Sequence, residues 1–156
     1  RLGPFVQSLS DVLGTGAILL IDYGYPRHEY YHPQRLEGTM VCHYRHRRHA
    51  DPFAHVGLQD ITASVDFTQV AESAAASGLT VAGFATQAGF LIGAGLDEVI
   101  AADDTGGGVE SWRRSREAGQ LILPGQMGEH FKAMALTRNV GGPLKAFSFQ
   151  NHVHRL

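Results

Sequence analysis

The sequence lacks the features that would assign it to several specialised classes of protein. It has one cysteine among 156 residues, Cys42, so no disulfide forms within the chain. Its apolar runs fall short of the roughly 18 residues that a membrane-spanning helix needs. Its 13 basic and 15 acidic residues nearly cancel, whereas electrostatic binding of nucleic acid needs a concentrated basic face. We therefore expect a globular domain inside a cell or an organelle, with no membrane and no nucleic-acid partner.

The balanced total conceals one basic segment. Residues 27–51 contain five arginines against three acidic residues, a charge of +2, and the rest of the chain carries −4. Five of the nine histidines lie in the same segment. No helical or strand periodicity is visible between residues 25 and 61, and an irregular connection of this length in a compact domain is usually functional. We therefore predict a functional loop or insertion here.

The apolar pattern predicts alternating helices and strands. A continuous apolar run between glycines at residues 17–21 is typical of a strand buried on both faces of a parallel sheet. Further strands are predicted at 79–84 and 131–137, and residues 146–149 are predicted to pair with the second of these. Helices are predicted at 5–13, between Asp66 and Gly78, and at 87–92, 96–102 and 109–118, with a glycine break at 106–108.

The histidines of the basic segment have spacings that resemble metal-ligand motifs. The two sets are His28-x3-His32 and His43-x2-His46-x2-His49. Three arginines are interleaved with the second set, and their charge opposes the binding of a divalent cation. No metal site is therefore predicted.

The interleaved arginines are Arg45, Arg47 and Arg48, and they are suited to an anion. A guanidinium offers a planar fork of donors to a carboxylate or a phosphate, and Tyr44 adds a stacking surface. The alternative is that these arginines hold the loop in place by pairing with acidic residues of the same chain. The candidates are Asp51, Asp60 and Asp66. The sequence leaves both interpretations open.

Carboxylates are predicted to gather at one edge of the sheet. Asp22 follows the strand at 17–21, and Asp60, Thr62 and Asp66 precede the next helix. Ligands of open α/β sheets bind beyond the carboxyl ends of the strands, where carboxylates can orient a cationic nitrogen. Capping of that helix, with Gln69 three residues further on, is the stronger interpretation for Asp66.

Neither glycine-rich stretch has the position of a nucleotide-binding loop. Such a loop lies between the end of a strand and the start of a helix. Gly14-Thr15-Gly16 instead precedes a strand, and residues 106–108 follow no clear strand. Any cofactor-binding loop is therefore expected outside this chain. The chain also begins without Met and without a targeting pattern, so we expect a fragment of a longer protein.

Five ordered motifs carry a resemblance to a known family. They are Ile21-Asp22-Tyr23-Gly24, Gly38-Thr39-Met40 to His43-Tyr44-Arg45-His46-Arg47, Asp60-Ile61-Thr62-Ala63-x-Val65-Asp66-Phe67, Thr86-Gln87-Ala88-x-Phe90-Leu91 and Met127-Gly128-Glu129-x-Phe131-Lys132. Together they resemble the carboxyl-terminal part of the MidA-type S-adenosylmethionine-dependent methyltransferases, which include the mitochondrial protein arginine methyltransferase of complex I assembly. In that family the S-adenosylmethionine loop belongs to the amino-terminal part.

The resemblance implies an α/β fold, the carboxyl-terminal portion of a class I, Rossmann-like methyltransferase sheet. Residues 1–156 would be part of one domain, and residues 25–61 an insertion over the substrate side. The strands at 17–21, 79–84 and 131–137 would be the fifth, the sixth and an antiparallel seventh. It also implies methyl transfer to a protein side chain, arginine by resemblance, in a bacterial cytoplasm or the mitochondrial matrix. Such transfer needs alignment of the reactants and no metal.

The implied roles fall on residues of the quoted motifs. Carboxylates would orient an arginine and a histidine would accept its proton, and the predicted catalytic residues are Asp22, His46 and Asp66. The predicted substrate-binding residues are Tyr23, Arg45, Asp60 and Thr62. We expect the chain alone to be inactive and, with an unpaired strand edge, to form a homo-oligomer. The alternative function is a non-catalytic docking module that holds an acidic partner with the Arg-, His- and Tyr-rich segment.

Overall fold

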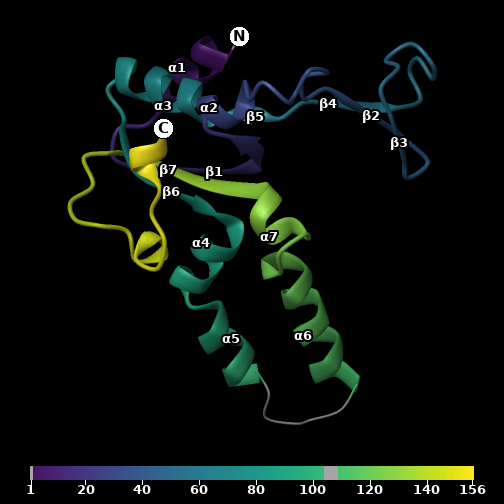
Figure 1. Ribbon diagram of the computed structural model, residues 1–156. Coiled ribbons are helices and arrows are strands. Elements are labelled where there is room, and N and C mark those ends of the chain that lie inside the picture. Colours follow the sequence, from purple (N-terminus) through teal and green to yellow (C-terminus); the bar gives the residue numbers. More distant parts are fainter. Residues whose placement is uncertain (1, 104–108) are drawn as a thin grey trace.

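The structure, a computed structural model, describes residues 2–103 and 109–156. Its main sheet has the strand order β5 (Val65–Asp66), β1 (Gly16–Tyr25), β7 (Phe131–Arg138) and β6 (Thr80–Thr86). β7 is antiparallel to β1 and to β6, and β5 is parallel to β1 over two residue pairs. The predicted α/β fold is confirmed, and an antiparallel strand lies between two strands that run in the same direction (Figure 1).

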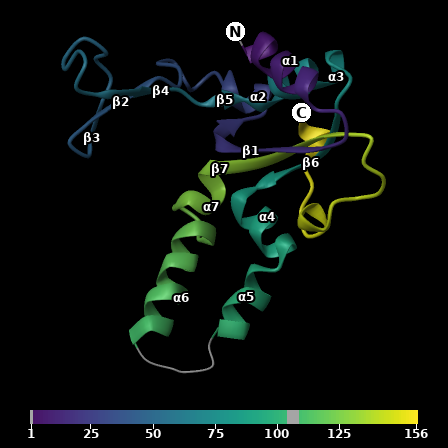
Figure 2. The ribbon, with the colours of Figure 1, turned by 180° about the vertical axis from the view of Figure 1, so that it is seen from behind.

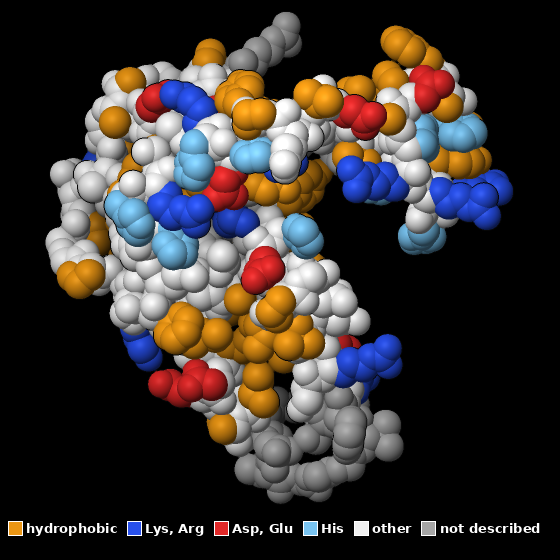
Figure 3. All heavy atoms as spheres, viewed as in Figure 1, with side chains coloured by type: hydrophobic (Ala, Val, Ile, Leu, Met, Phe, Trp, Pro, Cys, Tyr) orange, Lys and Arg blue, Asp and Glu red, His pale blue; other side chains and the backbone are white. Residues whose placement is uncertain are grey.

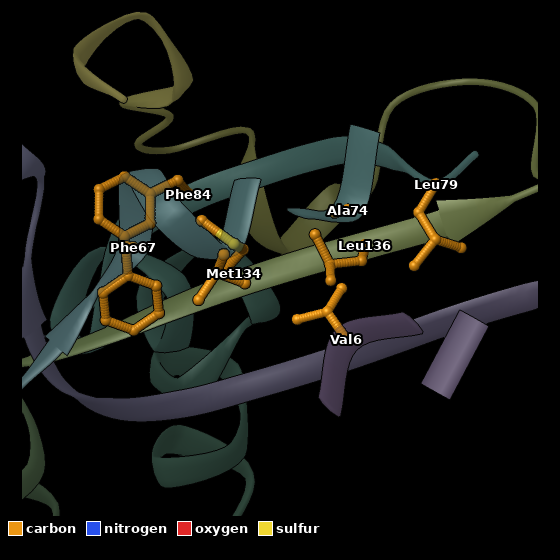
Figure 4. Packing of buried hydrophobic residues seen from close by; sticks show 8 residues of the cluster. Val6, Phe67, Ala74, Leu79, Phe84, Met134 and Leu136 are labelled. Atoms are coloured by element: carbon orange, nitrogen blue, oxygen red, sulfur yellow. The ribbon is translucent and has the colours of Figure 1, made fainter. Parts of the chain in front are cut away.

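Two helices cover one face of this sheet. They are α1 (Leu2–Val12) and α3 (Phe67–Ala76), which pack against each other. α3 begins after Asp66 and ends before Gly78, whose φ of 74° suits a helix terminator, as the sequence predicts. The main hydrophobic core lies between these helices and the sheet (Figure 4), and its buried members are Val6, Phe67, Val70, Ala74, Leu79, Phe84, Met134 and Leu136.

The other face is covered over β6 and β7. Helix α4 (Gln87–Ala94) and the 3-10 turn η1 (Lys145–Phe147) pack there. Phe147 fits above Gly83, where any Cβ would overlap its ring. The prediction that residues 146–149 pair with β7 is therefore wrong, because Phe147 is used to pack on the face of the sheet and not to extend its edge.

β1 differs from its prediction in two ways. It was expected to be buried on both faces, but only Ile18 and Leu20 pack against the core, while Leu19 and Ile21 are 48% and 45% exposed. On the face opposite the main core, the described elements pack against β6 and β7 and not against β1. Leu19 and Ile21 are therefore uncovered. The strand also continues to Tyr25, so Asp22 lies within it and not after its end.

The segment at 25–61 was predicted to be irregular, and it instead contains short elements. Helix α2 (Arg27–Tyr30) is followed by strands β2 (Val41–Tyr44), β3 (Arg47–His49) and β4 (Asp60–Thr62), which form a second sheet of order β3-β2-β4. We call residues 41–62 the arm, because they project from the main sheet (Figures 1 and 2). Strands this short, made mostly of polar residues, have no alternating pattern to detect.

A pair of helices extends from the opposite side of the sheet to form a leg (Figures 1 and 2). They are α5 (Leu96–Asp103) and α6 (Val109–Ile122), both predicted, and α7 (Met127–His130) connects α6 to β7. The predicted glycine break at 106–108 lies outside the described residues. Among the described helices, none has the length and apolarity to span a membrane.

Candidate functional site

A crevice of about 440 Å³ lies at the carboxyl end of β1, and we call it the strand-end crevice. Ligands of α/β sheets usually bind at this position. Three parts of the chain form its walls: the end of β1, the arm with the residues after it, and the junction of α7 and β7. The lining residues are Tyr23, Tyr25, His43, Arg48, Thr62, Ser64, His130 and Phe131.

The antiparallel register brings the start of β7 to the end of β1. Tyr23 and Phe131 are paired across the two strands, and their rings meet edge to face with centroids 5.6 Å apart. Gly128 allows α7 to approach the end of α6, because a Cβ there would overlap the backbone of Ile122. The crevice therefore depends on a pairing between residues far apart in the sequence.

Tyr25 presents an aromatic face that already receives a guanidinium. The Arg35 guanidinium carbon lies 4.2 Å from the centre of the Tyr25 ring, and the Lys132 Nζ lies 5.9 Å from it. The Nε of Arg35 is buried without a hydrogen-bond partner. The Tyr25 ring is thus placed to attract cationic groups.

Lys132 lies beside this face on β7 and opposite Asp22. Burial lowers the pKa of Lys132 below its usual 10.5, while the nearby Glu29 and Glu129 oppose the shift. Its Nζ also donates a hydrogen bond to the carbonyl oxygen of Glu129. A partly desolvated amine is therefore part of the surroundings of the crevice.

Asp66 has a structural role in which each of its two carboxylate oxygens has a partner. Its Oδ1 accepts a hydrogen bond from the Gln69 backbone N at 3.0 Å, which caps α3, and its Oδ2 lies 3.4 Å from the Arg27 Nε. Arg27 also donates to both carboxylate oxygens of Glu72, at 2.7 and 2.6 Å. This bidentate pair lowers the pKa of Glu72. The predicted cap is confirmed, and Asp66 is not among the lining residues of the crevice.

The other predicted catalytic residues also lie outside the crevice lining. Asp22 is exposed, and strand alternation puts its side chain on the Leu20 side of β1, away from Tyr23. Its Oδ1 accepts a hydrogen bond from the Tyr23 backbone N at 2.8 Å. His46 lies in the turn between β2 and β3. The structure therefore does not bring the predicted catalytic residues together in this crevice.

Two of the four predicted substrate-binding residues do meet there. Tyr23 and Thr62 both line the strand-end crevice. Asp60 lies on β4 opposite His43, which lines the crevice, and Arg45 belongs to a different cavity.

Sequence reasoning missed most of the lining. The unpredicted members include Tyr25, His43, His130 and Phe131. The local signals were the His43-x2-His46-x2-His49 spacing and the Met127–Lys132 motif, which by themselves indicate a basic loop and a turn. The position of the Met127–Lys132 motif at the end of β1 follows from the β1–β7 register, which no local pattern records.

A larger cavity of about 810 Å³ lies on the arm, and we call it the arm cavity. It is lined by Tyr44, Arg45, Arg47, Arg48, His49, Asp51, Ala54 and His55. Arg and His side chains are prominent on the arm in the space-filling view (Figure 3). Across residues 2–103 and 109–156, no three His, Cys, Asp or Glu side chains are grouped so that they could hold a metal ion.

The described strand-to-helix junctions do not form a nucleotide-cofactor loop. β1 leads into a four-residue helix through Pro26, and α3 is capped by Asp66. α4 is capped by Thr86, whose Oγ1 accepts a hydrogen bond from the Gly89 backbone N at 3.1 Å. A glycine-rich turn that leaves helix N–H groups open to a cofactor is thus not present among these junctions.

Comparison with known proteins identifies relatives of this fold. A family model described as "Putative S-adenosyl-L-methionine-dependent methyltransferase" matches residues 1–85. No curated protein matches the chain. A crystal structure from Burkholderia thailandensis, described as a "likely methyl transferase" bound to S-adenosyl-homocysteine, is 42% identical with a TM-score of 0.95. A native structure of an uncharacterized protein of the same superfamily and organism has the same identity and TM-score.

The two solved structures match nearly all of this chain, 99% in each case, but the chain spans only 40% and 41% of their lengths. The family model covers more than half of the 156 residues. The chain therefore belongs to this family of S-adenosyl-L-methionine-dependent methyltransferases.

Proposed function

We propose that this chain forms the substrate-side part of an S-adenosylmethionine-dependent methyltransferase that modifies a protein side chain. The observation that supports this most is the strand-end crevice, in a fold shared with the Burkholderia structure that binds S-adenosyl-homocysteine. The described strand-to-helix junctions do not fit the cofactor's loop. We therefore place the cofactor contacts on residues outside this chain, upstream of Arg1.

We further propose that residues 1–156 are the carboxyl-terminal part of one methyltransferase domain of the MidA type, with 25–61 as an insertion. β1 supports this arrangement, because its edge opposite β7 is paired with the described residues only at Gly24 and Tyr25. Further parallel strands of a methyltransferase sheet would continue from that edge. The five MidA-like motifs support the type.

Arginine is the acceptor that the crevice favours. Tyr25 lines the crevice, and its ring already stacks against the guanidinium of Arg35. An incoming arginine would displace Arg35 from this ring or stack on its other face, and cations bind aromatic faces more strongly where water is excluded. The chain's own part in the reaction is then to hold the planar guanidinium in one orientation.

Methylation of a guanidinium nitrogen releases a proton, which needs an acceptor. Asp22 and His46 remain proposed for orientation and proton acceptance, and they are tested by Asp22→Asn and His46→Ala. His43 and His130 line the crevice and are better placed for the proton. Methyl transfer that survives both Asp22→Asn and His46→Ala, but falls in His43→Ala or His130→Ala, would move the role to the crevice histidines.

The test is to restore the sheet by co-expressing this chain with the remaining part of the Burkholderia protein. Transfer of a labelled methyl group from S-adenosylmethionine is then measured on arginine-containing peptides. Tyr25→Leu is expected to lower kcat/KM about tenfold, equivalent to about 1.4 kcal/mol of lost acceptor binding. Tyr31→Leu, which removes an exposed ring outside the crevice lining, is the matched control and should change little.

Calorimetry separates the location of the cofactor from the identity of the acceptor. S-adenosylmethionine should bind the Burkholderia protein and should not bind this chain alone. Tight binding by the chain alone would contradict our placement of the cofactor. Methylation of lysine peptides in preference to arginine peptides would contradict the acceptor.

A further inference from the structure

The arginines of the arm cavity outnumber the acidic residues of its lining. Arg45, Arg47 and Arg48 are exposed, and within the described residues none of them forms an ion pair. Asp66 is instead held by Arg27. The lining contains one acidic residue, Asp51, whose Oδ1 accepts a hydrogen bond from the Phe53 backbone N at 2.8 Å. Of the two interpretations open at the sequence level, internal pairing is not observed for these three arginines.

The hairpin that carries these arginines is built in an unusual way. Arg45 and His46 form the turn between β2 and β3 with φ values of 48° and 63°, where glycine or asparagine is normally favoured. The register places Arg47 opposite Tyr44 and Arg48 opposite His43. Large polar side chains thus occupy turn positions that the backbone alone would give to smaller residues, which points to a use for these side chains.

Aromatic rings form much of the remaining cavity wall. Tyr44 stacks on His55 with ring centroids 4.0 Å apart, and His49 meets His55 edge-on at 5.7 Å. The Arg45 guanidinium lies 5.3 Å from the Tyr44 ring centre. The Nε2 of His49 is buried without a hydrogen-bond partner. The cavity therefore combines free cationic groups with flat apolar surfaces.

We propose that the arm cavity binds an acidic segment of the protein that is methylated, with Asp or Glu carboxylates paired to Arg45, Arg47 and Arg48. This inference rests on the proposed function for the identity of the partner. Arg48 lines both the arm cavity and the strand-end crevice, so the two are adjacent. An extended polypeptide held by its acidic segment on the arm would reach the crevice with a neighbouring residue, its acceptor arginine.

A protein partner fits these observations better than a nucleic acid. The arm carries only three of the 13 Lys and Arg residues, and the whole chain has a net charge of −2. Nucleic-acid binding gains its strength from neutralising many phosphates along an extended basic face. Three arginines around one cavity match a short run of carboxylates, each of which accepts a paired hydrogen bond from a guanidinium.

The test measures binding of labelled peptides to this chain by fluorescence anisotropy, without cofactor. The probe is a glutamate-rich peptide that contains one arginine, and the comparison peptide has glutamine in place of each glutamate. We expect the glutamate peptide to bind, with an affinity that falls as salt rises, and the glutamine peptide to bind at least about tenfold more weakly.

A charge-matched pair of variants locates the binding. Arg47→Gln/Arg48→Gln should weaken binding of the glutamate peptide about tenfold or more. Arg113→Gln/Arg116→Gln removes the same charge from α6 and should leave the affinity within about twofold, since a remote charge on the leg contributes only screened, long-range attraction. Thermal unfolding of both variants verifies that they are folded. If Arg47→Gln/Arg48→Gln does not fold, the comparison of the glutamate and glutamine peptides on the unchanged chain still tests whether acidic residues are bound.

Three results would overturn the proposal. They are equal binding of the glutamate and glutamine peptides, equal losses in the two double variants, and tighter binding of a single-stranded oligonucleotide than of the glutamate peptide. Failure of the proposed function can be told apart from failure of this binding proposal, because the proposed function is tested by methyl transfer in the restored enzyme and the binding proposal by peptide affinity. In the restored enzyme the arm variant should raise KM for the acidic peptide, whereas an unchanged KM would count against the arm.

Discussion

At the scale of single residues, Asp66 shows how one carboxylate can satisfy two local demands. It caps α3 through Oδ1 and lies beside Arg27 through Oδ2, and it is 8% exposed. Both contacts are explained by the position of the helix start next to the β1–α2 junction. A catalytic role would need one of these oxygens to be released.

Substitutions at Asp66 separate the two contacts. Asp66→Ala removes the cap and is expected to lower the free energy of unfolding by about 1 to 2 kcal/mol. Asp66→Asn keeps an acceptor for the Gln69 N–H and loses only the charge facing Arg27, so its effect should be smaller. Urea denaturation of the three proteins measures the difference. Unchanged stability in Asp66→Ala, together with lost methyl transfer in the restored enzyme, would return Asp66 to a catalytic role.

The same residue shows which contacts a sequence can reveal. The Asp66 cap involves a backbone group three residues away, so the local pattern predicted it. Tyr23 and Phe131 meet only through the β1–β7 register, and His43 and Arg48 reach the crevice through the arm. Tyr23 and Thr62 were predicted because they belong to the motifs that carry the family resemblance. The remaining lining residues were not predicted, since they meet only through tertiary pairing of the strands.

At the scale of elements, β1 was detected by its apolar run but not to its full length. The run ends at Ile21, yet the strand continues through Asp22 to Tyr25, because β7 pairs with it as far as Tyr23 and β5 pairs with its last two residues. Burial on both faces was inferred from the run alone. The long elements were predicted well and the short strands of the arm were not, because the hydrophobic period is visible only over several residues.

Gly24 is the residue on which the β1–β5 junction depends. A Cβ at this position would overlap the Val65 carbonyl oxygen and the ring of Phe67. Gly24→Ala is therefore expected to destabilise the protein by about 1 to 3 kcal/mol, the usual cost of overpacking. Gly14→Ala is the matched control, because a Cβ there meets nothing within 4 Å. Equal unfolding midpoints for the two variants in urea would show that β5 can shift without cost.

At the scale of the whole molecule, the two outer edges of the main sheet differ in how fully their backbone groups are paired. The outer edge of β6 is met by the carboxyl-terminal segment: the Phe84 carbonyl accepts from the His152 N at 2.6 Å, and the Gln150 side chain accepts from the Thr86 N at 2.9 Å. The outer edge of β1 is paired with the described residues only at its last two positions, next to exposed Leu19 and Ile21. Proteins normally protect such edges, because open strands pair with other chains.

This asymmetry predicts that the chain alone associates through β1. Sedimentation velocity should show larger species as concentration rises, and Leu19→Lys/Ile21→Lys should shift them towards the monomer, because charges beside an open edge oppose pairing. Val12→Lys/Leu36→Lys adds the same charge at exposed positions elsewhere and should not. Addition of the remaining part of the Burkholderia protein should suppress association of the unchanged chain if the β1 edge is where a methyltransferase sheet continues. A chain that stays monomeric at all concentrations would mean that this edge is protected, and the sheet would then have no place to extend.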